Sequence, residues 1–191
     1  MKIAILGWGS LLWDIKPEFD DHHAEWNLDG PILKLEFSRV SQTRDDALTL
    51  VIDSKNGSPC KVAYTFSYRK DSDDVISDLR CREGTTIKNI GFYYSDGSRT
   101  CNCDNDSLKS ISIWASDNNI DIVVWTNLSS NFKEKSKHQE MFSVDNALKH
   151  LQQIDAKGKA KAAEYVWRAP DFINTPLREA LHSQPWFPKH D

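Results

Sequence analysis

The most informative segment of this chain is Ile3-Ala4-Ile5-Leu6-Gly7-Trp8-Gly9-Ser10-Leu11-Leu12. Its apolar start, residues 3–6, is typical of a buried strand. The glycines that follow permit tight backbone turns, so we expect a loop whose backbone N–H groups are free to converge. Such a loop can bind an anion or a developing oxyanion. The alternative is an ordinary tight turn covered by core tryptophans.

The Gly-x-Gly spacing also suggests the first turn of a dinucleotide-binding fold. That motif requires a third glycine where this chain has Leu12, and the bulky Trp8 and Trp13 crowd the turn. It also requires a crossover helix, but the next segment, which contains Asp20-Asp21-His22-His23, has no helical periodicity. The sequence therefore argues against a nicotinamide cofactor.

Strand patterns dominate the first half of the chain. A helix is expected at residues 71–82, where the acidic residues from Asp71 favour the start and Gly84 fits a left-handed C-terminal cap. We expect strands at residues 32–40, 47–52, 61–66, 87–94 and 121–126, the first three in an antiparallel meander. Further helices are expected at residues 106–116, 144–154, 159–167 and 175–181. This order indicates an α+β fold with a mixed or closed sheet and a helical C-terminal third.

Composition narrows the class of protein. The chain has 191 residues, with 24 Lys and Arg against 28 Asp and Glu, so its formal net charge is 24 − 28 = −4. This length fits a single domain over residues 1–191. The acidic balance argues against nucleic-acid binding, which requires a clustered basic face. No apolar run approaches the ~20 residues of a membrane helix and no secretory signal is evident, so we expect a soluble, cytoplasmic protein.

The cysteines are too few and too irregularly spaced for a disulfide scaffold. Cys101-Asn102-Cys103 could offer two thiolates to a metal, with His22 or His23 as a further ligand. Structural zinc sites, however, show paired Cys or His spacings that this chain lacks. We therefore expect reduced thiols and no metal site.

Glu83 is the second candidate functional residue. It lies at the expected exit of the helix at residues 71–82, where the negative end of the helix dipole disfavours ionisation of a carboxylate. Burial would act in the same direction and would suit a general acid or base. Arg80, three residues earlier, would oppose both effects. The alternative is a solvated glutamate beside two arginines.

Together, the loop and the glutamate resemble the gamma-glutamyl cyclotransferase-like superfamily. Gly7-Trp8-Gly9-Ser10-Leu11-Leu12 is similar to that family's Tyr-Gly-Ser-[Asn/Leu]-Leu loop. In the family a strand, a helix and a catalytic Glu before a small residue follow the loop. The resemblance covers residues 1–126, and the matching segments come in the same order: Val62-Ala63-Tyr64-Thr65-Phe66, Arg82-Glu83-Gly84, Ile90-Gly91-Phe92-Tyr93-Tyr94 and Val123-Val124-Trp125.

The resemblance implies a small mixed, partly closed β-barrel with flanking helices over residues 1–126. A helical extension over residues 127–191 would pack on it. The implied enzyme releases 5-oxoproline from a gamma-glutamyl amine or peptide by intramolecular cyclisation, without a metal or organic cofactor. Glu83 would be the catalytic residue, and the small-molecule substrate would bind at Gly7, Trp8, Gly9, Ser10 and Leu11.

Two other functions stay open. One is an enzyme of the same fold that acts on a different amide, and the other is a non-catalytic small-molecule binding module. Trp8 replaces the family's Tyr and so removes a phenolic hydroxyl from the loop. The C-terminal helices match no motif of the family, so the amine half of the substrate is not implied.

Overall fold

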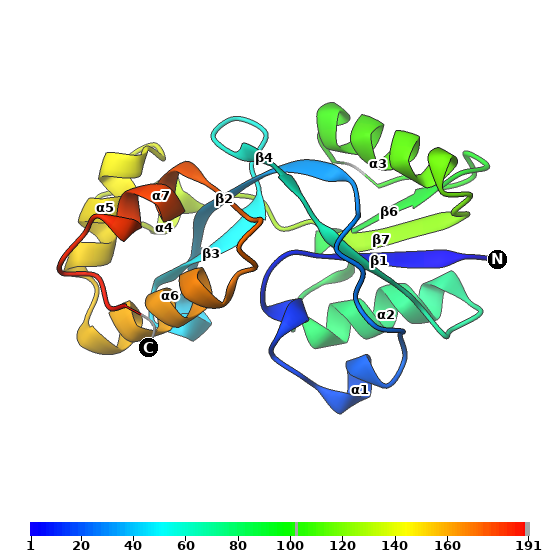
Figure 1. Ribbon diagram of the computed structural model, residues 1–191, viewed down its shortest axis with the longest axis horizontal. Helices are drawn as coiled ribbons and strands as arrows, with labels where there is room; N and C mark the ends of the chain where they lie inside the picture. Colours follow the sequence, from blue (N-terminus) through cyan, green and yellow to red (C-terminus); the bar gives the residue numbers. More distant parts are fainter. Residues whose placement is uncertain (102, 190–191) are drawn as a thin grey trace. The chain divides into compact units, whose positions relative to one another are not determined.

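The computed structural model describes residues 1–101 and 103–189, and within them the chain is mixed α+β with two sheets. The chain divides into two compact units, and Figure 1 colours it along the sequence. Unit 1 comprises Met1–Leu33 and Lys61–Leu128, and unit 2 comprises Lys34–Cys60 and Ser129–Asp191. No helix of the described residues is both long enough and apolar enough to cross a membrane.

Unit 1 is built on a sheet of strand order β5-β1-β7-β6. The central strand β1 (Ile3–Gly7) runs parallel to β7 (Ile122–Thr126) and antiparallel to β5 (Ala63–Phe66). Strand β6 (Ile90–Tyr94) pairs antiparallel with β7. Because β1 and β7 are parallel, their carboxyl ends reach the same edge of the sheet, where ligands bind in open α/β sheets.

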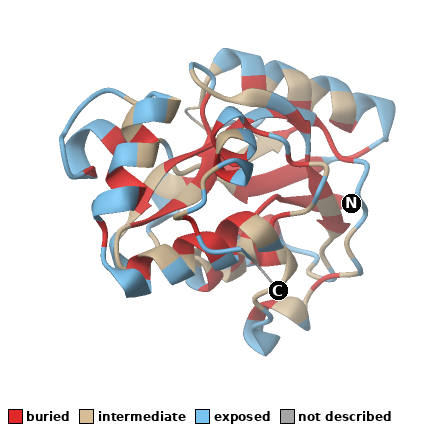
Figure 2. Cartoon of the chain, turned by 60° about the vertical axis from the view of Figure 1, so that its left-hand side comes forward, coloured by how far each residue is buried: buried red, intermediate tan, exposed pale blue. Residues whose placement is uncertain are grey.

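Helices cover both faces of this sheet. Helix α2 (Ser72–Arg82) and the short α1 (Pro17–Asp20) pack together on one side, and α3 (Asn105–Asp117) lies on the other (Figure 1). The core cluster between α2 and the sheet is mainly aliphatic and includes Ile3, Ile5, Val75, Ile76, Leu79 and Val124. Figure 2 colours the chain by how far each residue is buried.

The expected partly closed barrel and its meander are wrong. Strands β2 (Ile32–Ser41), β3 (Ala47–Ile52) and β4 (Ser58–Lys61) form a separate sheet of order β3-β2-β4. A strand has two edges, and in unit 1 both edges of β1 are occupied, by β5 and β7. The third expected strand, residues 61–66, is divided between the two sheets, because Lys61 ends β4, which pairs with β2, and Ala63–Phe66 form β5, which pairs with β1. The expected three-stranded meander is therefore not formed.

Unit 2 contains that second sheet and the C-terminal helices. Its helices are α4 (Phe132–Lys135), α5 (Val144–Gln153), α6 (Ala156–Arg168) and α7 (Pro176–His182). Helix α6 packs on β3, and α5 contacts both α6 and α7. The helical C-terminal third is confirmed. The expected single domain, with a core over residues 1–126 and an extension over residues 127–191, stays a prediction.

The ends of α2 follow from its sequence. Asp71 caps the start, because its carboxylate accepts a hydrogen bond of 2.9 Å from the amide of Asp73. Gly84 has a φ of 57°, and the amide of Thr85 donates to the carbonyl of Arg80 at 3.1 Å. This left-handed cap is the one predicted from the glycine. It leaves Glu83 as the last residue before the chain turns away from the helix.

Candidate functional site

The loop after β1 forms a tight turn. Residues Ser10–Leu12 form a 3-10 turn, η1, in which the amide of Leu12 donates to the carbonyl of Gly9 at 3.0 Å. The amide of Asp14 donates to the carbonyl of Ser10 at 2.9 Å. Within residues 1–101 and 103–189, the amides of Gly9, Ser10 and Leu11 make no hydrogen bond to another backbone group. The backbone of the described residues therefore does not use these three amides, and the same holds for the amide of Trp8.

The side chains of the loop contribute mainly to packing. Trp8 and Leu11 are buried in the core, and a Cβ atom added to Gly7 would lie 2.8 Å from the ring of Trp26. Gly9 is buried, and Ser10 is only partly buried. Of the five residues expected to bind substrate, Ser10 is thus the only one that is not buried.

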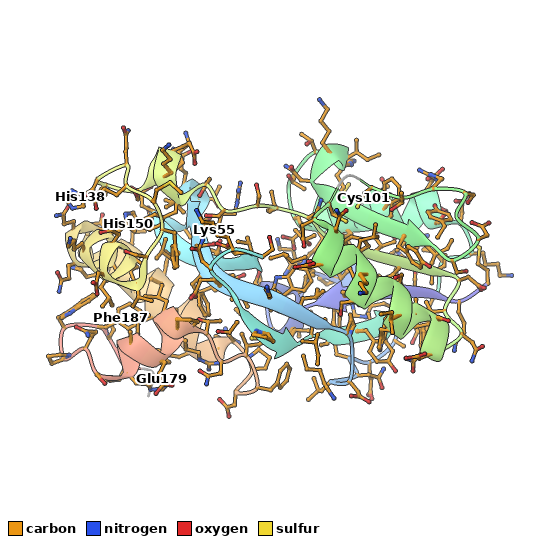
Figure 3. All side chains as sticks on the ribbon, turned by 90° about the horizontal axis from the view of Figure 1, so that it is seen from above. Lys55, Cys101, His138, His150, Glu179 and Phe187 are labelled. Atoms are coloured by element: carbon orange, nitrogen blue, oxygen red, sulfur yellow. The ribbon has the colours of Figure 1, made fainter. Side chains whose placement is uncertain are left out.

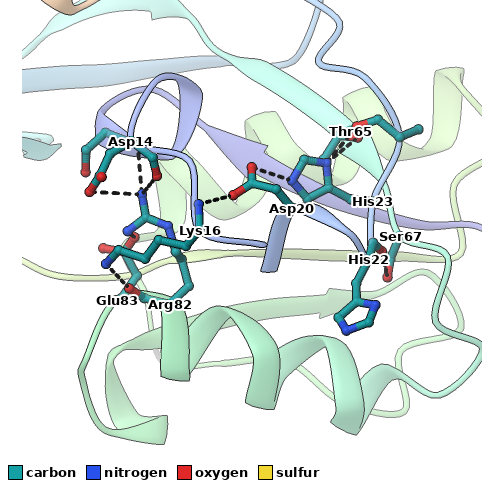
Figure 4. Close-up of polar contacts among 11 residues, drawn as sticks. Asp14, Lys16, Asp20, His22, His23, Thr65, Ser67, Arg82 and Glu83 are labelled. Carbon is teal, nitrogen blue, oxygen red and sulfur yellow. Dashed lines mark hydrogen bonds and ion pairs between the residues drawn. The ribbon is translucent and has the colours of Figure 1, made fainter. Parts of the chain in front are cut away.

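Arg82 brings this loop to the end of α2. Its Nη2 donates to the carbonyl oxygens of Ser10 at 3.0 Å and of Asp14 at 2.7 Å (Figure 4). The Asp14 carboxylate lies 3.5 Å from the same nitrogen. On the other side, Nη1 of Arg82 lies 3.9 Å from Oε1 of Glu83, whose side chain is 17% exposed. Ser10 and Arg82 are 72 residues apart in the chain, and the loop and Glu83 therefore meet around one guanidinium.

The sequence did not identify Arg82. Basic residues in the last turn of a helix ordinarily complement the helix dipole, and that pattern describes Arg80 and Arg82 equally well. The sequence predicts that Arg80 is the cation that stabilises the Glu83 carboxylate. In the structure the guanidinium of Arg80 instead donates to Sγ of Cys81 at 3.2 Å. Burial separates the two arginines, since the side chain of Arg82 is 3% exposed.

Other chain segments reach the same edge of the sheet. Strand β6 begins at Ile90 directly after a 3-10 turn, η3 (Ile87–Asn89), which replaces the first residues of the expected strand at 87–94. The amide of Asn127, just beyond β7, donates to the carbonyl of Asn89 at 2.8 Å. Helix α2 contacts both β7 and η3. The carboxyl end of the sheet in unit 1 thus gathers the loop, the end of α2 and this turn.

A second cluster, Asp20, His23 and Thr65, has the residue types of a hydrolase triad (Figure 4). Nε2 of His23 lies 3.4 Å from the Asp20 carboxylate, and Nδ1 lies 3.5 Å from the Thr65 hydroxyl. Thr65 is fully buried, and its hydroxyl donates to the carbonyl of Ala24 at 2.6 Å. No substrate can reach that hydroxyl, so the cluster fastens the segment around His23 to β5.

The cysteine pair offers no metal site within the described residues. Asn102, the middle residue of the expected motif, lies outside them. The thiol of Cys103 hydrogen-bonds to Cys101 and lowers the pKa of Cys101 to about 7, while the same contact raises the pKa of Cys103 (Cys101 is labelled in Figure 3). Among residues 1–101 and 103–189, no three His, Cys, Asp or Glu side chains are grouped as a metal requires. His22 and His23 therefore have no such group to join.

Unit 2 holds a surface cavity of about 500 Å³. Trp167, Arg178, His182 and Lys189 are among the side chains that line it. Arg178 is committed to the main chain, since Nη1 donates to the carbonyls of Pro170 at 2.7 Å and Ile173 at 2.8 Å. The acidic Asp171 and Glu179 also line the cavity and balance its two fixed positive charges. This balance selects no class of ligand.

Glu36 is a buried carboxylate of unit 2 that the sequence did not single out. Strand alternation puts it on the same face as the exposed Lys34, but Glu36 is fully buried. Its carboxylate accepts hydrogen bonds from the amides of Phe37 at 2.7 Å and Leu177 at 3.2 Å. Burial raises the pKa of Glu36 to about 7. Because Leu177 lies in α7, its hydrogen bond to Glu36 links β2 to that helix, and Glu36 has a structural role.

Comparison with family models, with curated proteins and with solved structures finds no match for this chain. The resemblance to the cyclotransferase-like superfamily therefore stands on the sequence motifs alone. The structural feature that bears on function is the arrangement of the loop, Arg82 and Glu83 in unit 1.

Proposed function

We propose that this chain is a gamma-glutamyl cyclotransferase-like enzyme, which releases 5-oxoproline from a gamma-glutamyl amine or peptide. The observation that supports the proposal is the meeting of the Gly7–Leu11 loop and Glu83 around the Arg82 guanidinium. In the family that the sequence resembles, a loop of this kind holds the glutamyl group and a glutamate after a helix moves the proton. Both parts lie in unit 1, so the proposal requires nothing from unit 2.

The reaction makes few demands on the protein. The α-amine of the glutamyl group attacks its own side-chain carbonyl carbon, so the entropic cost of bringing the reactants together is low. A carbon–nitrogen bond forms in the five-membered lactam, and the bond from the same carbon to the leaving amine breaks. Glu83 accepts the proton of the attacking amine and delivers it to the leaving amine. No oxidant, reductant or water is consumed.

The loop would stabilise the negative charge that develops on the carbonyl oxygen. Backbone N–H groups that are already oriented do this without reorganisation during the reaction. The amides of Gly9, Ser10 and Leu11 make no backbone hydrogen bond within the described residues, and Ser10 adds a side-chain hydroxyl to the loop. Trp8 and Leu11 are buried, and their packing would hold the loop backbone in place.

Net charge and the state of the cysteines bear on the partners and the location of the enzyme. We propose a small-molecule substrate and no nucleic-acid partner, because the chain carries a net charge of −4. A cytoplasmic location would suit Cys60, Cys81, Cys101 and Cys103, which are free thiols.

The test is a screen of gamma-glutamyl amines and gamma-glutamyl dipeptides for release of 5-oxoproline by the purified chain. We expect turnover of at least one compound and no release from the corresponding N-acetylated compounds, whose amine cannot attack. Binding of these compounds without turnover would instead favour the non-catalytic binding module. Turnover of other amides, with none of gamma-glutamyl compounds, would favour the different-amide enzyme.

A further inference from the structure

Arg82 occupies an unusual place for an arginine. It ends α2 with its side chain only 3% exposed, and within the described residues its guanidinium contacts oxygens of Ser10, Asp14 and Glu83. Its Nε is buried and has no hydrogen-bond partner within the described residues. A buried guanidinium with an unsatisfied N–H is costly, and an apolar side chain of similar size would fill the same space without that cost.

The directions of its hydrogen bonds indicate what the arginine does there. Nη2 donates to the carbonyls of Ser10 and Asp14, which lie at the start of the η1 turn and just beyond it. The carbonyl of Ser10 shares its peptide plane with the amide of Leu11, so the hydrogen bond from Arg82 fixes the direction of that amide. The carbonyl of Gly9 shares a plane with the amide of Ser10 and is held within the same turn by the amide of Leu12. Nη1 faces the Glu83 carboxylate at 3.9 Å. One planar, rigid group thus sets the loop and the carboxylate in relation to each other.

We propose that Arg82 is a positioning residue, which holds the Gly9–Leu11 amides and the Glu83 carboxylate in the mutual geometry that cyclotransfer requires. This inference rests on the proposed function. A lysine could not replace the arginine, because a single ammonium cannot donate in a fixed plane to two carbonyls while it faces a carboxylate. Loss of the contact should therefore affect the chemical step more than substrate affinity, since small misplacements are costly in rate.

The test compares Arg82→Met and Arg82→Lys with Arg80→Met, which removes the same charge from the same helix turn. The first measurement is hydrogen exchange at the amides of Leu12 and Asp14, both of which donate within the turn. The second is the split between kcat and KM on the substrate found in the screen. The third is rescue of Arg82→Ala by guanidinium ion in the tens of millimolar, with sodium chloride and urea as controls.

We expect faster exchange at Leu12 and Asp14 in both Arg82 variants and no change in Arg80→Met. Loss of kcat should be on the order of a hundredfold with little change in KM, and guanidinium should restore part of it. If Arg82→Met does not fold, Arg82→Lys, which keeps the charge, is compared with Arg80→Met by the same measurements. Unchanged kcat in a folded Arg82 variant, or equal effects of Arg80→Met, would overturn the positioning role alone. A wild-type chain that turns over no gamma-glutamyl compound would overturn the proposed function and this role with it.

Discussion

Gly7, the last residue of β1, and Gly9, in the loop after it, have different roles although they are close in sequence. Gly7 lies under Trp26, whose ring atoms would be 2.8 Å from an added Cβ. A real Cβ cannot approach a ring carbon that closely, so Gly7 is required by packing. Gly9, in contrast, carries one of the loop amides that make no backbone hydrogen bond within the described residues. The proposal requires Gly9 for close approach of a ligand to the backbone.

These roles predict different outcomes for the two alanine variants. Gly9→Ala should weaken binding of 5-oxoproline or substrate by on the order of tenfold, with little change in the free energy of unfolding. Gly7→Ala should lower the free energy of unfolding by about 1–3 kcal/mol, because Trp26 has to move. Calorimetric titration and urea unfolding of both variants measure the two effects. Unchanged ligand affinity in a well-folded Gly9→Ala would count against the loop as the binding site.

At the scale of elements, the end of α2 places both Arg82 and Glu83. Gly84 turns the chain at a φ of 57°, and an added Cβ there would meet nothing within 4 Å. Gly84→Ala should therefore cost only the left-handed backbone strain, about 1 kcal/mol in the free energy of unfolding. Gly84→Asn should cost less, since asparagine tolerates this conformation. Urea unfolding of the three proteins gives the comparison, and an alanine variant as stable as wild type would contradict it.

The helices and most strands could be predicted because their signals are local. The caps of α2, the apolar run of β1 and the valine-rich β7 are each contained in a few neighbouring residues. The barrel could not be excluded in this way, because it depends on which strands pair. Strand β1 pairs with β7, whose first residue is Ile122, and no pattern of neighbouring residues indicates which distant strand will pair with β1. The short α1 and α4 were also missed, since four residues are too few to show helical periodicity.

The candidate site was predictable in part for the same reason. Glycines and a helix-terminal glutamate have local signatures, so the loop and Glu83 could be named from the sequence. The part played by Arg82 depends on carbonyls of Ser10 and Asp14, which are far away in the chain. Glu36 could not be recognised for a different reason. Strand alternation predicts one buried and one exposed face, but β2 buries both Glu36 and its neighbour Phe37.

At the scale of the whole molecule, the proposed chemistry lies in unit 1, while unit 2 contains a pH-sensitive group. The fully buried Glu36 has its pKa raised from 4.5 to about 7 by burial, and nearby Asp53 raises it further. Hydrogen bonds from Thr175, Phe37 and Leu177 oppose this by lowering the pKa. Between these two pH values the folded chain holds a proton that the unfolded chain has lost. The stabilisation is complete below pH 4.5 and is lost as the pH rises through 7.

Glu36→Gln should remove this dependence. We expect the variant to become more stable relative to wild type as the pH rises from 5 to 7, by on the order of 3 kcal/mol at most. Glu164→Gln, an exposed residue of unit 2, is the matched control and should show no such trend. Unfolding in urea at a series of pH values provides the measurement. A difference between Glu36→Gln and wild type that stays constant with pH would show that Glu36 is ionised throughout.

The proton relay assigned to Glu83 is the central claim, and Glu83→Gln tests it most directly. The amide keeps the size of the side chain but cannot carry a proton between the two amines. The measurement is 5-oxoproline release at saturating substrate by wild type, Glu83→Gln and the surface control Glu18→Gln, together with the Kd of each for the same compound. We predict that kcat of Glu83→Gln falls by ~10²–10⁴ while its Kd and that control stay close to wild type. Turnover by Glu83→Gln at a near-normal rate would contradict the account.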